Sequence, residues 1–214
     1  MSQKPFSSLA LKPELLSTLD SLGFTEMTPV QAQSLPQILD GSDVIAQAKT
    51  GSGKTAAFGL GLLQKLDVKR FRVQSLVLCP TRELADQVSR ELRRLARGIH
   101  NIKILTLCGG APFGPQLGSL QHGAHIVVGT PGRVEEHLRK GSLQSGDVTT
   151  LVLDEADRML DMGFQEQLDA ILSQLPANRQ TLLFSATYPD SIDGLARRVM
   201  KNPAMVKVDT VHGS

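Results

Sequence analysis

The chain has 214 residues, of which 41% are hydrophobic and 21% are charged. This balance is typical of a soluble globular protein with one domain, or at most two, and argues against a fibrous or disordered chain. Lysine and arginine number 23 against 21 acidic residues, so the net charge of +2 provides no bulk attraction to nucleic acid or to acidic membranes. Any site for a polyanion must therefore be a local patch.

The cysteine content and the apolar segments indicate a reducing compartment and no membrane span. Only Cys79 and Cys108 are present, and the first residues do not resemble a signal peptide, so we expect a cytoplasmic protein. The stretch 104–132 has no Asp, Glu, Lys or Arg, but glycine and proline interrupt it repeatedly, which excludes a membrane helix. We expect a monomer that does not contact membranes.

Short apolar runs recur along the chain, and segments with helical periodicity separate them. This alternation predicts an α/β fold with a mainly parallel sheet of about seven strands and helices on both faces. Residues 1–40 contain helical segments but no strand, so we expect them to pack as an extension on a domain formed by residues 41–214. The predicted strands are 43–46, 75–79, 103–107, 125–128, 150–153, 181–184 and 205–208, and the predicted helices are 13–21, 30–39, 54–66, 82–97, 133–140, 165–175 and 192–200.

A phosphate-binding loop is expected between the first strand and the helix after it. Residues 48–55 match G-x-x-x-x-G-K-S/T, except that Ala48 replaces the first glycine. Backbone N–H groups of such a loop cradle a polyphosphate, Lys54 contacts its β- and γ-phosphates, and the Thr55 hydroxyl ligates Mg²⁺. A glycine-rich turn with a solvated lysine is the alternative, which the flanking strand and helix disfavour. The predicted loop residues are Ala48, Lys49, Thr50, Gly51, Ser52, Gly53, Lys54 and Thr55.

Two acidic residues follow a buried strand and suit the chemistry of a phosphate loop. Asp154 comes directly after an apolar run, where a carboxylate holds Mg²⁺ directly or through water. If strand geometry persists, Glu155 points the other way and orients or deprotonates a water that attacks the γ-phosphate. The alternative interpretation is an acidic first turn of a helix.

With these residues in place, the sequence resembles the DEAD-box ATP-dependent RNA helicases, and it is similar in particular to a bacterial subgroup directed at ribosomal RNA. The run 154–157 reads Asp-Glu-Ala-Asp, and the resemblance covers nearly the whole chain. It implies a RecA-like fold for residues 41–214 and an adenine-reading Q motif in residues 1–40. In that motif Gln31 hydrogen-bonds the base, Phe6 stacks on it, and Phe24 belongs to the same element.

The resemblance also implies an RNA half-site and a coupling element. Ser185 and Thr187 would hydrogen-bond Asp157 and couple hydrolysis to strand separation. The RNA elements offer backbone N–H groups, hydroxyls and guanidinium groups, which suit phosphate and sugar oxygens and do not read base sequence. The implied RNA-binding residues are Pro80, Thr81, Arg82, Gly109, Gly110, Thr130, Pro131, Gly132 and Arg133.

The function implied by the resemblance is ATP-dependent local opening of RNA duplexes, with ATP and Mg²⁺ as cofactors and ribosomal RNA of the large subunit as the expected target. Family members carry a second RecA-like domain with an arginine finger, and the subgroup adds an RNA-recognition domain. Neither is visible in these 214 residues, so we expect the chain alone to bind nucleotide but to hydrolyse ATP and unwind RNA poorly. An ATP-gated RNA clamp with little turnover and a DNA helicase of the same superfamily are the alternatives.

Overall fold

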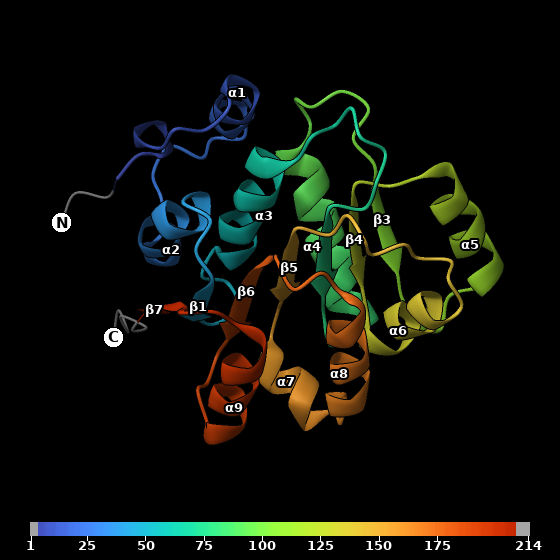
Figure 1. The fold of residues 1–214 in the computed structure, drawn as a ribbon. Helices are drawn as coiled ribbons and strands as arrows, with labels where there is room; N and C mark the ends of the chain where they lie inside the picture. Colours follow the sequence, from blue (N-terminus) through green and yellow to red (C-terminus); the bar gives the residue numbers. More distant parts are fainter. Residues whose placement is uncertain (1–3, 209–214) are drawn as a thin grey trace.

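The computed structural model describes residues 4–208 and has a seven-stranded sheet at its centre (Figure 1). Every pairing between neighbouring strands is parallel. The strand order is β3-β4-β2-β5-β6-β1-β7. The strands are β1 (Val44–Gln47), β2 (Ser75–Leu78), β3 (Ile104–Leu107), β4 (Ile126–Gly129), β5 (Thr150–Leu153), β6 (Gln180–Ser185) and β7 (Ala204–Lys207).

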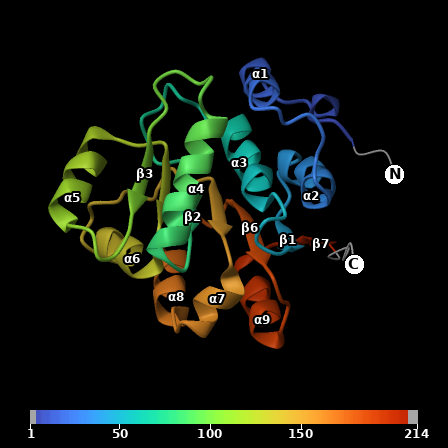
Figure 2. The ribbon, with the colours of Figure 1, turned by 180° about the vertical axis from the view of Figure 1, so that it is seen from behind.

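Helices cover both faces of the sheet, as Figures 1 and 2 show from opposite sides. Alternate strand residues face two separate cores, so Val44 and Ala46 pack with α1 to α4, whereas Ile45 packs with α6 to α9. The helices are η1 (Phe6–Ser8), α1 (Pro13–Ser21), α2 (Pro29–Leu39), α3 (Lys54–Lys65), α4 (Arg82–Leu95), α5 (Phe113–His122), α6 (Pro131–Arg139), α7 (Ala156–Asp161), α8 (Gln165–Gln174) and α9 (Asp190–Val199).

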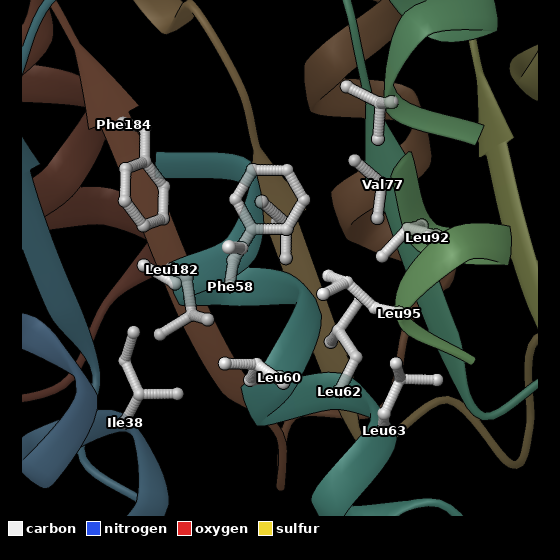
Figure 3. Close-up of a cluster of buried hydrophobic side chains, with 14 of the residues drawn as sticks. Ile38, Phe58, Leu60, Leu62, Leu63, Val77, Leu92, Leu95, Leu182 and Phe184 are labelled. Carbon is white, nitrogen blue, oxygen red and sulfur yellow. The ribbon is translucent and has the colours of Figure 1, made fainter. Parts of the chain in front are cut away.

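The helix that follows the phosphate loop packs unusually closely on its neighbours. A Cβ atom added at Gly59 would lie 2.9 Å from Leu92 Cδ2 of α4, and one added at Gly61 would overlap Ile38 of α2. Phe58 packs against Phe184 of β6, with ring centroids 5.3 Å apart (Figure 3). Because α3 is fixed on three sides, the loop at its N-terminus has a rigid support.

The main predictions about the fold are confirmed. Each of the seven predicted strands is present, the sheet is entirely parallel in the described residues, and the predicted helices lie within three residues of their expected limits. Before β1 the described residues form helices and one isolated bridge, between Pro5 and Glu26. The helices α5 and α7 were not predicted. Within residues 4–208, no helix is long and apolar enough to span a membrane.

Candidate nucleotide and RNA site

The strand order divides the carboxyl edge of the sheet into two halves. Strands β1, β6 and β5 are neighbours, so the phosphate loop after β1, Ser185 at the end of β6 and Asp154 after β5 lie on adjacent strands. Strands β2, β4 and β3 form the other half, and the segments beginning at Pro80, Thr130 and Cys108 follow them. Ligands bind beyond the carboxyl ends of strands in open parallel sheets. The topology therefore collects the expected nucleotide elements on one half and the expected RNA elements on the other.

The phosphate loop has the backbone geometry that its glycines predict. Gly51 and Gly53 adopt φ angles of +86° and +87°, which glycine reaches without a Cβ penalty. Gly53 is the residue before α3, so the N–H groups of Lys54 and Thr55 lie in the first turn of that helix, where its partial positive charge favours anions. Lys49 and Thr50 are exposed.

Alanine is compatible with the first position of the loop. Ala48 is buried, and its N–H donates to the Ser185 carbonyl at 3.0 Å, which extends the β1–β6 pairing by one residue. Its φ angle is negative, unlike those of Gly51 and Gly53. The departure from the sequence pattern at this position therefore leaves the loop intact.

Lys54 lies between the two acidic residues that follow β5. Its Nζ is 2.8 Å from Asp154 Oδ1 and 3.5 Å from Glu155 Oε2. The Asp154 side chain is completely buried and the Lys54 side chain is 6% exposed. Burial raises the pKa of Asp154, and the charge of Lys54 opposes that rise. The ion pair therefore offsets part of the cost of burying the carboxylate.

The prediction that Glu155 points away from Asp154 is wrong, because Lys54 reaches both carboxylates. Strand geometry ends at Leu153, and Glu155 adopts a left-handed conformation with φ +53° and ψ +52° immediately before α7. This conformation is costly for a residue with a side chain, by about 1–2 kcal/mol. It turns the Glu155 side chain, which is 13% exposed, back toward the phosphate loop.

Several buried polar atoms around the loop have no hydrogen-bond partner in the described residues. They are Ser52 Oγ and both carboxylate oxygens of Asp154; the contact of Oδ1 with Lys54 is close but lacks hydrogen-bond geometry. Buried polar atoms without partners are rare and point to a ligand or ion. Residues 4–208 hold no cluster of three or more His, Cys, Asp or Glu suited to a metal. This donor set fits Mg²⁺, which commonly binds through one or two carboxylates together with substrate phosphates.

A cavity of about 430 Å³ extends from the phosphate loop to the N-terminal helical segment. Gln31 lies in its wall, where Oε1 accepts from Thr28 N at 2.9 Å and Nε2 donates to the Gly53 carbonyl at 3.0 Å. A primary amide has two donor hydrogens and two acceptor lone pairs, so one of each remains. Gln31 can therefore offer an acceptor and a donor to one edge of a base.

Two aromatic residues line the same cavity. Phe6 is buried and Phe24 is half-buried, with the Arg94 guanidinium 5.7 Å from its ring centroid. Gln87 and Glu91 of α4 also line this wall, and they were not predicted because their approach depends on how α3 and α4 pack. Thr28 was also missed, although Thr28-x-x-Gln31 is a recognisable capping box.

The predicted coupling contact forms through Thr187 rather than through Ser185. Asp157 Oδ2 accepts from Thr187 Oγ1 at 2.9 Å and from Thr187 N at 3.2 Å. Ser185 is buried, and its hydroxyl donates to the Thr187 carbonyl at 2.6 Å. Ser185 thus supports the loop that carries the contact and does not touch Asp157 itself.

The expected RNA elements lie at helix N-termini and in the double-glycine segment. Thr81 precedes α4, and its hydroxyl accepts from Leu84 N at 3.2 Å, while Arg82 next to it is exposed. Thr130 precedes α6 in the same way, and its hydroxyl accepts from Gly109 N at 3.1 Å. Gly109, Gly110 and Gly132 are exposed, whereas Pro80 and Pro131 are buried and shape the turns.

Arg133 has a different environment from the one expected. Its Nη1 donates to the Ala111 carbonyl at 2.8 Å and to Gln116 Oε1 at 3.0 Å, and its Nε lies 3.0 Å from Glu136 Oε1. The side chain is only 15% exposed. Most of this guanidinium group is therefore used inside the protein, and Nη2 alone has no partner among residues 4–208.

A phosphate loop that faces a buried Asp and a strained Glu, on a sheet that is all-parallel in the described residues, is typical of P-loop nucleotide-binding domains. Residues 28–195 match the family model of the DEAD/DEAH box helicases, and the chain belongs to this family. Its fold is the RecA-like P-loop domain. A DEAD box protein from the hyperthermophile Methanococcus jannaschii superposes with a TM-score of 0.92 at 38% identity, covering 96% of this chain and 56% of that one.

Two curated relatives are more similar in sequence. The chain is 60% identical over 206 residues to the ATP-dependent RNA helicase DbpA of Escherichia coli K12, covering 96% of this chain and 45% of the relative. It is 49% identical to the DEAD-box ATP-dependent RNA helicase CshA of Geobacillus kaustophilus HTA426, with coverages of 95% and 43%. The chain thus spans less than half the length of these relatives.

Proposed function

We propose that the chain is the ATP-binding half of an ATP-dependent RNA helicase that locally opens RNA duplexes. The observation that carries the proposal is that Asp154 and Glu155 each place a carboxylate oxygen within 3.5 Å of Lys54 Nζ, next to the phosphate loop. The proposed partners are RNA and a second RecA-like domain, and the protein is a cytoplasmic monomer. Ribosomal RNA is the proposed target because DbpA is similar over 96% of this chain.

Each residue of the nucleotide half-site has a proposed role. Loop N–H groups and Lys54 bind the β- and γ-phosphates, and Thr55 and Asp154 hold Mg²⁺, which neutralises phosphate charge when bound. Glu155 orients the attacking water and accepts its proton. The left-handed backbone of Glu155 fixes its carboxylate close to Lys54, which supports this role.

Adenine is the base that the remaining hydrogen-bonding capacity of Gln31 fits. Adenine presents an N6 donor beside an N7 acceptor, which match the free lone pair on Oε1 and the free hydrogen on Nε2. Guanine presents two acceptors, O6 and N7, on the corresponding edge, so one of them would face Oε1 unfavourably. The proposed site therefore prefers ATP and ADP over GTP.

Competition against a fluorescent adenine nucleotide in the presence of Mg²⁺ tests the half-site directly. ATP and ADP should displace the probe and GTP should not, and Lys54→Ala should abolish binding. Lys69→Ala is the matched control, because Lys69 is an exposed lysine on the loop before β2, at the opposite edge of the sheet. Equal displacement by GTP would contradict the role of Gln31. Binding that survives in Lys54→Ala would contradict the role of the loop.

Hydrolysis and unwinding are proposed to require the second domain, because an arginine finger contributes about 10³–10⁵ in rate to phosphoryl transfer. The 214 residues alone should therefore show little RNA-stimulated turnover. In a two-domain protein containing this chain, Glu155→Gln should retain RNA binding but lose repeated unwinding. An unchanged function in that variant would favour the alternative of an ATP-gated RNA clamp with little turnover.

A further inference from the structure

Gln116 of α5 connects the segments on both sides of the expected RNA half-site. The side chain is buried, with 7% exposure, although it is polar and lies on a helix with no other buried residue. Its Nε2 donates to the Cys108 carbonyl at 3.1 Å, and its Oε1 accepts from Arg133 Nη1 at 3.0 Å and from His137 Nε2 at 2.8 Å. Gln116 therefore links the end of β3, α5 and α6.

The chemistry of its partners fixes the orientation of the Gln116 amide. A carbonyl can only accept and a guanidinium can only donate, so Nε2 must face Cys108 and Oε1 must face Arg133. His137 must then carry its proton on Nε2 to donate to the same oxygen. Burial, with the nearby charge of Arg133, lowers the pKa of His137, which favours the neutral ring.

The remaining atoms of His137 are also engaged. In the neutral ring Nδ1 is an acceptor for the Ser142 hydroxyl, 2.7 Å away, in competition with the His137 carbonyl, which the same hydroxyl reaches at 3.1 Å. The ring is fully buried and stacks on Phe113 with centroids 4.2 Å apart and an angle of 7° between the planes. A polar network whose buried members are hydrogen-bonded to one another holds its elements in one arrangement.

The network surrounds the double-glycine segment on both sides. Gln116 holds the carbonyl before Gly109, Arg133 holds the carbonyl after Gly110 at 2.8 Å, and Gly109 N donates to Thr130 Oγ1 at 3.1 Å. The spacing between the exposed glycines and the N-terminus of α6 is therefore set by buried contacts. Arg133 is oriented by the same contacts, which leave its Nη2 as the nitrogen available to a phosphate oxygen.

We propose that Gln116 is a positioning residue for RNA binding. It does not contact RNA, and it acts by fixing Gly109, Gly110 and Arg133 at the distances that successive phosphates of one strand require. The inference rests on the proposed function of this edge as an RNA half-site. Its physical basis is that prealigned backbone donors bind an anion strongly only while their supporting contacts hold them within about 0.5 Å of the productive geometry.

The test compares Gln116→Met with Gln121→Met, an equivalent change at an exposed glutamine of the same helix. Methionine keeps the length and flexibility of the side chain but removes its hydrogen bonds. The measurements are the anisotropy of a labelled single-stranded oligouridylate at several salt concentrations and the affinity for a fluorescent adenine nucleotide, both with the 214-residue chain. His137→Phe is a second variant, because it removes the Nε2 donor while keeping a ring to stack on Phe113.

We expect Gln116→Met to weaken RNA binding about tenfold or more and to flatten its salt dependence, because phosphate contacts are lost. His137→Phe should weaken RNA binding less, and Gln121→Met should not change it. Nucleotide affinity should stay within twofold in all three. If Gln116→Met leaves RNA binding unchanged, or weakens nucleotide and RNA binding equally, the inference is wrong. A parent chain that binds nucleotide but no RNA would refute the proposed half-site itself, and the inference with it.

Discussion

Replacing Gly53 with alanine probes the contact between the phosphate loop and Gln31, the proposed reader of adenine. A Cβ atom at Gly53 would lie 2.6 Å from Gln31 Nε2 and 2.8 Å from Thr28 Oγ1, so the Gln31 side chain must move. Gly51 is the matched control in the same loop. Its φ angle is +86°, against +87° for Gly53, but a Cβ atom there would meet nothing within 4 Å.

The difference between the two alanine variants isolates the collision. Both variants incur a left-handed backbone cost of about 1–2 kcal/mol, and both gain the same reduction in unfolded-state entropy, so these contributions cancel. Gly53→Ala also displaces the Gln31 amide from Thr28 N and from the Gly53 carbonyl. Each net hydrogen bond contributes about 0.5–1.5 kcal/mol. We expect Gly53→Ala to be less stable than Gly51→Ala by about 1–3 kcal/mol.

Urea denaturation of the chain and both variants measures this difference in the free energy of unfolding. The second measurement is the ratio of ADP to GDP affinity, which should fall towards one in Gly53→Ala because Gln31 no longer has a fixed orientation. Gly51→Ala should keep the preference of the parent chain for adenine. Equal stability of the two variants, or retained base preference in Gly53→Ala, would refute the assignment of Gln31 as an oriented reader held by the loop.

Three further predictions concern buried or strained groups. Glu155→Gly should be about 0.5–1 kcal/mol more stable than Glu155→Ala. Glycine removes the left-handed backbone strain, and the greater entropy of its unfolded chain offsets only part of that gain. Coinciding urea midpoints of the two variants would count against the strain. The pKa of Asp154 is raised in the parent chain, and Lys54→Met should raise it further because the opposing charge is removed. The pH-dependent loss of stability relative to the parent should therefore begin above the pKa of Asp154 in the parent and level off above its higher pKa in the variant; a loss independent of pH would contradict this. Because the pKa of His137 is lowered in the folded protein, the folded state loses stability as pH falls below about 6.5, where the ring is protonated more readily in the unfolded chain. The urea midpoints at pH 7.5 and 5.5 should therefore differ less in His137→Phe than in the parent chain. Equal differences would argue against a buried neutral ring.

The strands and the phosphate loop could be predicted because their signals are local. Apolar runs of four or five residues located all seven strands, and the Gly53-Lys54-Thr55 spacing located the loop. The helix α5 could not be predicted in this way, because its sequence contains Gly114, Pro115 and Gly118 and no charged residues, which is poor helix-forming composition.

The remaining parts of the site depend on contacts between distant segments. The inward orientation of Arg133 is set by Ala111 and Gln116, and no motif records those partners. The direction of Glu155 was mistaken because strand alternation was extended past the end of β5 into a left-handed residue. The sequence motifs therefore predict which residue types form the site, whereas the orientations of side chains such as Arg133 and Glu155 depend on contacts between distant segments and on the local backbone.

The ion pair between Lys54 and Asp154 has a consequence for nucleotide exchange. A lysine buried beside the phosphate loop would carry a large desolvation cost if it had no counter-charge, and Asp154 and Glu155 supply that charge within the protein. An arriving polyphosphate must therefore compete with two resident carboxylates for one ammonium group. When it departs, the lysine returns to partners that are already in place. The site thus trades binding strength for reversibility, which is what repeated nucleotide exchange under the proposed function requires.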